Sequence, residues 1–491
     1  MDLIDYREGV EETLDSLDRW LEELIYEVTY ASAASVELLE GLRNVLERIR
    51  DRLPDVVKEY ADEDLDLAQP TIRIGHILSF LHQVIFTISE TSQDRTPAAL
   101  VDSLRSVAQR YVDGDVVLLF RPGQRALEYT FIPFGSRLDQ ILGGAEAIVG
   151  VPLRDALKLS GKKIVLLSYP ASEQNNVLLH SIFLHEIGHF ITHEHNVPKK
   201  AFDACMAAAE SLPSEFAGKP EAAVLDMQAI LRRWLWELAA DASAIRLVGP
   251  AYFFGIYRSM LVGEALDQYS REHPPAWLRL RMMLNQLVSA GYPEVTVLEK
   301  PLAEWDARLL AAEQRFRAQL PKAKLINVAG EAQDQALFRM TEKLLPFVVA
   351  EVGTAVNKDE YTAEHYMREC PHLVQQLREF IPLNEWYAED QAGVEEGGTA
   401  AQVTPAGEAV AEKMGKGSWH VSTLAGILNA GWSYVIAGLD EAYGTVGAET
   451  SAERREFRRR IFALIAKSIE LAQIQGDVAV GGGRLFPTTS Q

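Results

Sequence analysis

The chain has 491 residues, of which 48% are hydrophobic, and its formal net charge at pH 7 is −22. This length predicts about two to four domains with extensive buried cores. The negative charge argues against a protein that wraps nucleic acid, because a duplex would repel most of this surface, and we attribute the acidity to solubility.

The sequence gives no sign of secretion or membrane insertion. The N-terminus, MDLIDYREGVEETLD, is acidic and lacks a basic segment followed by an apolar one, so we expect no signal peptide. No uncharged apolar run reaches about eighteen residues, and we interpret the most apolar stretch, Val421–Leu439, as a buried helix. Cys205 and Cys370 are too few for a disulfide framework and fit a reducing compartment. We therefore expect a cytoplasmic protein without an integral membrane segment.

The N-terminal region is expected to be helical. Leucine and isoleucine recur at three- and four-residue spacing among charges from Tyr6 to Tyr60, which predicts two amphipathic helices, the second ended by Pro54. Further helices are expected at about Ile72–Ile88 and Pro97–Tyr111. The pattern fits helices that pack on their own domain and equally an arm that binds a regulatory protein.

The residue pattern of the sequence changes at Asp115. The short β-branched and aromatic runs DVVLLF, ALEYTFIPF and KKIVLLSYP are separated by the turn signals RPGQ and SGKK, which predicts at least three strands of a small sheet. Beyond Pro198 the chain is again helical, and Glu221–Val248 is expected to be one long helix that ends before Gly249 and Pro250. The fold class is therefore α+β and predominantly α-helical.

The C-terminal part is expected to contain a linker and a helical pair. Glycine, alanine and glutamate dominate residues 388–418, which predicts a linker or surface loop. Two helices, about Val421–Tyr443 and Ser451–Gln475, and a glycine-rich tail follow. The expected regions are an N-terminal helical region (1–112), a domain that contains the histidine motif described next (113–290), a helical region (291–387), the linker or loop (388–418), a C-terminal helical pair (419–475) and a flexible tail (476–491).

The segment FLHEIGHFITHEH contains His185, Glu186 and His189. Two histidines four residues apart lie on one helix face and can occupy two corners of a tetrahedral zinc site. Glu186 adjoins the first histidine but is rotated away from the metal, where a carboxylate can take a proton from water and return it to a leaving amine. We predict His185 and His189 as metal ligands and Glu186 as the general base.

Two residues compete for the third ligand position. His195 lies ten residues after His185, so HEIGHFITHEH nearly matches the HExxHxxGxxH of the metzincins, but Thr192 replaces the glycine that bends the chain there. Glu237, in ELAAD, lies on a later helix and is followed four residues on by Asp241. In this pair Glu237 would bind the metal, and Asp241 would accept a hydrogen bond from a ligating imidazole.

With HExxH on one helix and ExxxD on a later one, the sequence resembles the gluzincin metallopeptidases. ELAAD is similar to the E-x-x-A-D of the HtpX-like and CAAX prenyl protease metallopeptidases, and HPPAWLR (His273–Arg279) is similar to their H-P-P-x-x-x-R segment. The resemblance covers about Lys163–Met283 and does not extend to that family's membrane-spanning segments. It implies a zincin-like core, one Zn²⁺ per chain, and stabilisation of the tetrahedral intermediate by His273 and Arg279, for which Arg281 could substitute in a shifted register.

These expectations describe a zinc-dependent metalloendopeptidase that acts on a protein or peptide substrate. Zn²⁺ lowers the pKa of a bound water to about 7, and Glu186 would accept its proton. In gluzincin-like folds a sheet-edge strand before the active helix binds extended substrate, and KKIVLLSYP is the candidate here. The alternative is a helical scaffold or regulatory binding protein with a structural or latent zinc site. Zinc suits this donor set best, although the sequence does not discriminate it from manganese, iron or cobalt.

Overall fold

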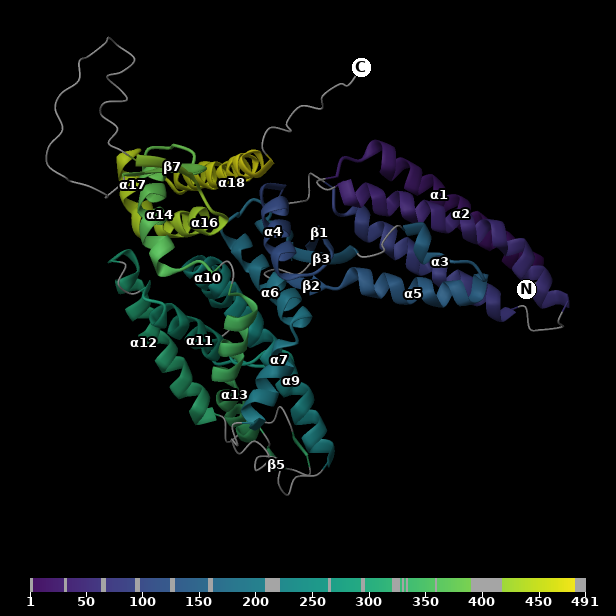
Figure 1. Cartoon of the computed structure of the whole chain (residues 1–491), viewed down its shortest axis with the longest axis horizontal. Coiled ribbons are helices and arrows are strands. Elements are labelled where there is room, and N and C mark those ends of the chain that lie inside the picture. The colour runs from purple at the N-terminus through teal and green to yellow at the C-terminus, as the bar shows by residue number, and fades with distance from the viewer. Residues whose placement is uncertain are drawn as a thin grey trace, which may run out of the picture. The chain divides into compact units, whose positions relative to one another are not determined.

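The structure is a computed structural model of the chain (Figure 1), and the residues it describes are 3–30, 33–62, 68–92, 98–123, 129–157, 162–207, 221–263, 266–292, 296–319, 327–328, 331–332, 334–357, 360–389 and 417–481. The chain divides into two compact units: residues 1–176 with 182–199 form the first, and residues 177–181 with 200–491 form the second. Helices dominate both units, and the first also contains a three-stranded sheet. The predicted class, α+β and predominantly α-helical, is confirmed.

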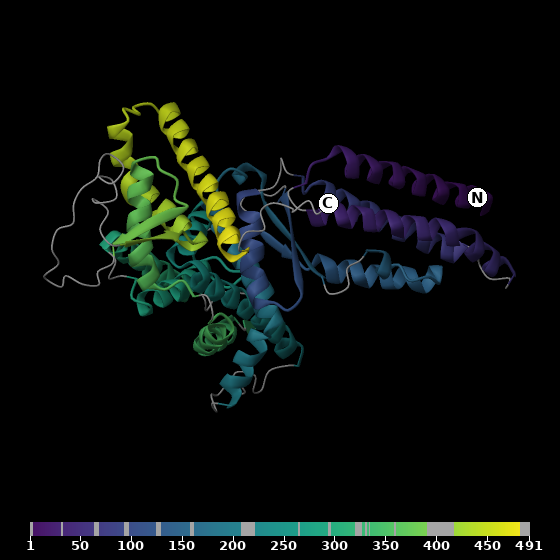
Figure 2. The same cartoon turned by 45° about the horizontal axis from the view of Figure 1, so that its top comes forward.

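The first unit is a group of helices packed on a small sheet. Its helices and 3-10 turns are α1 (Leu3–Glu27), α2 (Ala33–Asp62), α3 (Ala68–Ser89), α4 (Ala98–Tyr111), α5 (Phe134–Val149), η2 (Arg154–Leu157), η3 (Ala171–Glu173) and α6 (Phe183–Glu194). Helices α1, α2, α3 and α5 lie side by side (Figures 1 and 2) and share one continuous apolar core. The three- and four-residue spacing of leucine and isoleucine supplies that core.

Helix α2 continues through Pro54, so the predicted helix end at this residue is wrong. Proline removes one backbone hydrogen-bond donor from the helix. Leu53 and Val56, on either side of it, are each only 2% exposed. Packing of the amphipathic face contributes more to helix stability than local propensity does, and here it carries the helix past the proline.

The sheet has the strand order β1-β3-β2 and contacts α4, α5 and α6. Its strands are β1 (Asp115–Gly123), β2 (Thr130–Ile132) and β3 (Lys162–Pro170), with β1 parallel and β2 antiparallel to β3. Side chains alternate between the two faces. Val117 and Ile164 belong to the helical core, whereas the rings of Phe120 and Tyr169 contact Phe183 of α6. The sheet therefore positions α6, which carries the histidine motif.

The expectation that Lys162–Pro170 forms a sheet edge is wrong. β3 pairs with β1 along its whole length and with β2 at residues 166–168, so it is the central strand. A strand buried on both faces has a continuous apolar sequence, as KKIVLLSYP does. Among the described residues β2 pairs with β3 alone, and it is the edge strand beside α6, where the ring of Phe131 lies 6.0 Å from that of Phe190.

The described residues of the second unit are helical except for two pairs of short antiparallel strands. Its elements are η4 (Leu179–Ile182), α7 (Val197–Ala207, which begins in the first unit), α9 (Glu221–Val248), α10 (Pro250–Gly263), α11 (Ala276–Ser289), α12 (Thr296–Gln319), β4 (Asn327–Val328), β5 (Glu331–Ala332), α13 (Asp334–Ala355), α14 (Ala363–Arg378), β6 (Glu385–Glu389), β7 (Gly417–Val421), α16 (Leu424–Ser433), the π-helical turn η7 (Tyr434–Gly438), α17 (Leu439–Thr445) and α18 (Ser451–Gly481). Residues 390–416 of the predicted linker and 482–491 of the predicted tail lie outside the described residues.

Helix α9 has the bounds that the sequence predicts, Glu221–Val248. Gly249 ends it with φ +62°, a conformation that favours glycine. A Cβ at this position would also lie 2.7 Å from the hydroxyl oxygen of Tyr292. The chain then turns into α10 at Pro250, and this corner bears on the candidate site below.

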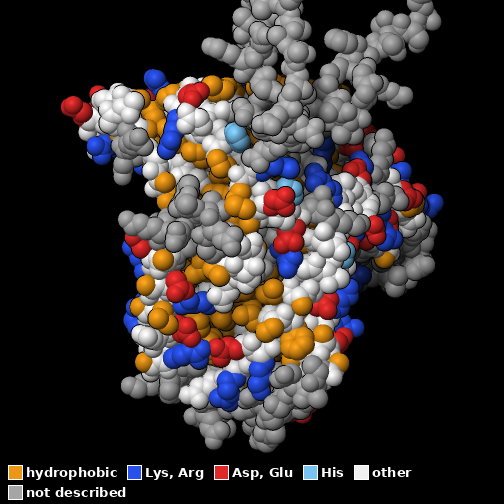
Figure 3. Space-filling view, turned by 60° about the vertical axis from the view of Figure 1, so that its left-hand side comes forward, with side chains coloured by type: hydrophobic (Ala, Val, Ile, Leu, Met, Phe, Trp, Pro, Cys, Tyr) orange, Lys and Arg blue, Asp and Glu red, His pale blue; other side chains and the backbone are white. Residues whose placement is uncertain are grey.

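The described residues contain no helix that is both long and apolar enough to cross a membrane. Figure 3 shows acidic and basic side chains interspersed over one face of the molecule, with hydrophobic side chains exposed between them. This mixture is typical of a protein surface, to which apolar atoms also contribute.

Candidate metal centre

Helix α6 carries the histidine motif on a buried face. His185 and Glu186 are 5% and 4% exposed, and His189 lies one turn further along the helix. The rings of His185 and His189 are 4.5 Å apart between centroids and nearly perpendicular, at 76°. Both imidazoles therefore occupy the same side of α6, as the spacing of four residues requires.

The first turn of α6 is held on the sheet by aromatic packing. Phe183 meets Phe120, Tyr129 and Tyr169 edge-on, with centroid distances of 5.2, 5.3 and 5.9 Å. Edge-to-face contacts of this kind are favourable beyond the burial of area. Because Phe183 lies two residues before His185, this cluster restricts the position of the first histidine.

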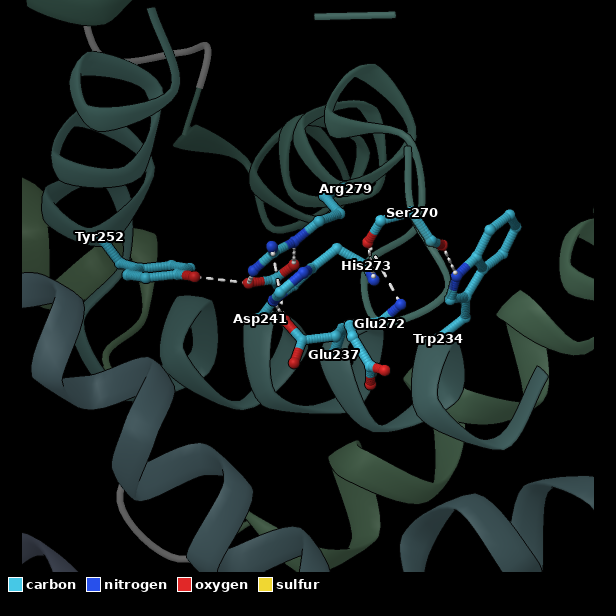
Figure 4. A network of polar contacts seen from close by, with 8 residues as sticks. All are labelled: Trp234, Glu237, Asp241, Tyr252, Ser270, Glu272, His273 and Arg279. Carbon is cyan, nitrogen blue, oxygen red and sulfur yellow. Dashed lines mark hydrogen bonds and ion pairs between the residues drawn. The ribbon is translucent and has the colours of Figure 1, made fainter. Parts of the chain in front are cut away.

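In the second unit, Glu237 and Asp241 lie one turn apart on α9 and share a cation (Figure 4). Arg279 of α11 donates from Nε to Asp241 Oδ2 at 2.7 Å and from Nη2 to Asp241 Oδ1 at 2.9 Å. Its Nη1 lies 3.4 Å from Glu237 Oε2. Tyr252 of α10 donates its hydroxyl to Asp241 Oδ1 at 2.5 Å. Asp241 is thus a fully buried carboxylate that accepts hydrogen bonds from both Arg279 and Tyr252.

The charges of this network are mutually stabilising. Burial alone would lower the pKa of Arg279, but the charge and hydrogen bonds of Asp241, with the charge of Glu237, raise it well above its ordinary value. Burial and the Asp241 charge raise the pKa of Tyr252. Arg279 therefore remains a cation and Tyr252 a neutral donor, which suits an ionised Asp241.

A short loop before α11 places His273 beside Glu237 (Figure 4). The Ser270 carbonyl accepts a hydrogen bond from Trp234 Nε1 at 3.0 Å, which fastens the loop to α9. The Ser270 hydroxyl accepts from the backbone N–H groups of Glu272 and His273, at 3.1 and 3.0 Å. His273 Nε2 lies 3.7 Å from Glu237 Oε2, and the His273 side chain is 58% exposed. This histidine is therefore within reach of a ligand in solution.

Three of the predicted ligands come together. One ligand atom from each of His185, His189 and Glu237 lies within 4.8 Å of the other two, which is close enough for one metal ion. Two imidazoles and one carboxylate suit zinc and other first-row divalent ions.

The structure also shows which groups the other residues of the predicted site contact. His195 Nε2 lies 3.0 Å from the carbonyl oxygen of Tyr111, at the end of α4. Arg281 pairs with Asp306 of α12, whereas Arg279 contacts Glu237 and Asp241. Asp241 accepts hydrogen bonds from Arg279 and Tyr252.

Sequence reasoning missed Tyr252. Its only signal is a hydroxyl in the apolar segment PAYFFGIY, at the start of a helix. A buried tyrosine hydroxyl usually has a hydrogen-bond partner, but the sequence does not indicate which one.

Comparison with known proteins adds nothing to this geometry. No family model, curated protein or solved structure matches the chain. The function is therefore inferred from the residues of the site.

Proposed function

We propose that this protein is a zinc-dependent metalloendopeptidase with a gluzincin-type site in a zincin-like core. The proximity of His185, His189 and Glu237 carries the proposal, because it joins an HExxH helix to the glutamate of a later helix. A site with three protein ligands leaves a coordination position for water, as catalytic zinc sites do. When bound, Zn²⁺ supplies Lewis-acid chemistry that activates water and polarises a carbonyl.

Glu186 is the general base of this proposal. It adjoins His185 on α6 and is buried, so its carboxylate is held next to the ligand pair and shielded from bulk solvent. A carboxylate in this place accepts a proton from the attacking water and delivers it to the leaving amine.

Arg279 and His273 have different roles in this proposal. Arg279 is buried and engaged with both Asp241 and Glu237, which fits a residue that orients the glutamate ligand. His273 is more than half exposed and lies near Glu237, which fits a donor to the oxyanion of the tetrahedral intermediate. Only the second residue would touch substrate.

The substrate of this proposal is an extended peptide segment that lies along β2. This strand is the sheet edge beside α6, and the ring of Phe131 lies 6.5 Å from that of His189. Addition of a peptide strand to a sheet edge supplies main-chain hydrogen bonds that do not depend on sequence. The low cysteine content supports a reducing, cytoplasmic location for the enzyme.

Elemental analysis of the purified wild type and of Glu237→Ala and His195→Ala variants tests the metal site. We expect near-stoichiometric zinc in the wild type and in His195→Ala, and loss of zinc in Glu237→Ala. Zinc lost only from His195→Ala would replace the proposed ligand set. Four protein ligands, measured by X-ray absorption on the wild type, would indicate a structural site.

The chemistry is tested with a quenched fluorescent peptide library. Glu186→Gln should retain zinc and lose cleavage, since the amide cannot accept the proton. Wild-type activity in Glu186→Gln would overturn the role of Glu186, and a metal-free wild type would overturn the proposed function.

A further inference from the structure

Helix α16 contacts, within the second unit, two chain segments that adjoin the proposed ligands. One is Leu178, shortly before the histidine motif. The other is the corner at which α9 ends and α10 begins, shortly after Asp241. Neither contact can be predicted from neighbouring residues, because α16 lies well over a hundred residues after both segments.

Asn429 bridges the corner between α9 and α10. Its Nδ2 donates to the Val248 carbonyl at 2.7 Å, and its Oδ1 accepts from the Ala251 backbone N–H at 2.8 Å. The carbonyls at the end of a helix and the N–H groups at the start of the next have no partner within their own helix. Asn429, 0% exposed, satisfies one of each. It therefore fixes the direction in which α10 leaves α9, and α10 carries Tyr252, the donor to Asp241.

The last part of α16 holds the other segment. Trp432 Nε1 donates to the Leu178 carbonyl at 3.1 Å. Gly431 lets the helix approach closely, since a Cβ at this position would lie 2.6 Å from Leu178 Cδ2. Ser181 Oγ is within hydrogen-bond distance of the Leu178 and Ala251 carbonyls, at 2.8 and 3.2 Å. The two segments that contact α16 are thereby also joined to each other.

Helix α16 is itself anchored to α14 at its N-cap. Glu369 accepts hydrogen bonds from Thr423, the N-cap residue of α16, through the backbone N–H at 2.7 Å and the hydroxyl at 2.9 Å. The first turn of α16 is thereby fixed, and the helix can transmit its position to the segments that it contacts.

We infer that Asn429 and Trp432 are positioning residues for the metal centre, acting through the α9–α10 corner and the Leu178 segment. The inference rests on the proposed function and extends it, because it makes the C-terminal helices part of the machinery that sets metal affinity. Buried amide hydrogen bonds in a low dielectric specify one geometry. Partners that orient a metal ligand are known to alter metal affinity when they are removed.

Cobalt titration of the full-length, metal-free protein tests this inference. Co²⁺ alone is the probe, and both its dissociation constant and its visible absorption spectrum, which reports coordination geometry, are measured. We expect Asn429→Ala and Trp432→Phe to weaken Co²⁺ binding on the order of tenfold and to alter the visible band. Trp432→Phe removes little more than the N–H donor and is the variant least expected to misfold.

Ser433→Ala is the matched control. It removes a buried hydrogen bond of the same helix, but that bond leads to α14 and not toward the metal centre. It should leave both the spectrum and the dissociation constant unchanged. Wild-type spectra and affinities in Asn429→Ala and Trp432→Phe would overturn the inference, as would equal weakening in Ser433→Ala, which would indicate general destabilisation. A wild type that binds no Co²⁺ would instead overturn the metal centre, and the inference with it.

Discussion

Arg279 and Asp241 form a buried two-point pair: Nε lies 2.7 Å from Oδ2, and Nη2 lies 2.9 Å from Oδ1. Only arginine offers two parallel N–H donors that match a carboxylate in this way. The pair joins α11 to α9, one turn after Glu237. The orientation of the proposed glutamate ligand and the stability of the second unit therefore depend on the same contact.

Arg279→Met should destabilise the protein by about 3–5 kcal/mol, because it leaves the Asp241 charge buried without its cation. The free energy of unfolding from urea titration measures the loss. Adding Asp241→Asn to Arg279→Met should recover part of it, since the buried group is then neutral. Arg281→Met is the control: its partner Asp306 is half exposed, and loss of such a pair costs about 0–1 kcal/mol. Equal losses from Arg279→Met and Arg281→Met would contradict the prediction.

The parts of the fold that the sequence predicts are those with a local signal. The long helix Glu221–Val248 and the strands near Asp115 and Lys162 follow from periodicity and turn residues, and the structure confirms them. The sequence does not predict that β3 is the central strand, because a continuous apolar run indicates that a strand is buried but not which strands it pairs with. Pairing partners are set by the packing of distant segments.

The candidate site likewise has one part that the sequence predicts and another that it does not. His185 and His189 share a face because they are four residues apart, which any helix enforces. Tyr252 and Asn429 reach their partners through the corner after α9, whose geometry depends on Gly249. No pattern in the sequence links Asn429 to that corner, so the contact between them cannot be predicted from the sequence.

His195→Ala should leave metal binding intact, whereas His189→Ala should abolish it. His195 Nε2 lies 3.0 Å from the Tyr111 carbonyl, so its removal should cost about 1 kcal/mol of stability, the worth of one hydrogen bond. His193→Ala, at an exposed position of α6, is the control for the loss of a nearby imidazole. Elemental analysis and thermal unfolding of the three variants measure both effects. Retention of metal by His189→Ala would rule out the ligand set.

Trp234→Phe should loosen the loop that carries His273. The substitution keeps the aromatic packing but removes the donor to the Ser270 carbonyl, at a cost of about 0.5–1.5 kcal/mol. Faster amide hydrogen exchange in residues 266–275, measured by mass spectrometry, is the expected sign. Trp277→Phe is a matched control, because the buried Trp277 Nε1 makes no hydrogen bond. The prediction is contradicted if the amide hydrogens of this loop exchange at the wild-type rate in both variants.

Glu369 should make stability fall as the pH rises. Burial raises the pKa of its carboxyl group above the ordinary value, although hydrogen bonds from Thr423 and Tyr361 oppose the shift. A folded-state pKa above the unfolded one means that the folded protein binds this proton more tightly. The stability contributed by this group is then complete below the unfolded pKa and declines as the pH rises through the folded pKa. Glu369→Gln has no charge to bury, so the wild type should lose stability relative to this variant as the pH rises above the ordinary pKa of glutamate, about 4.3.

Glu453 supplies the control of opposite sign. It is exposed at the start of α18, and hydrogen bonds, chiefly from Thr450, lower its pKa. Its contribution to stability is therefore present above the unfolded pKa and is lost as the pH falls through the folded one. Thermal unfolding across this pH range should show the wild type losing stability relative to Glu369→Gln as the pH rises, with no such loss relative to Glu453→Gln. If the unfolding temperatures of the wild type and Glu369→Gln change in parallel with pH, the prediction is wrong. The buried carboxylate would then ionise without a loss of stability, because the Thr423 donors at the start of α16 fully replace its hydration.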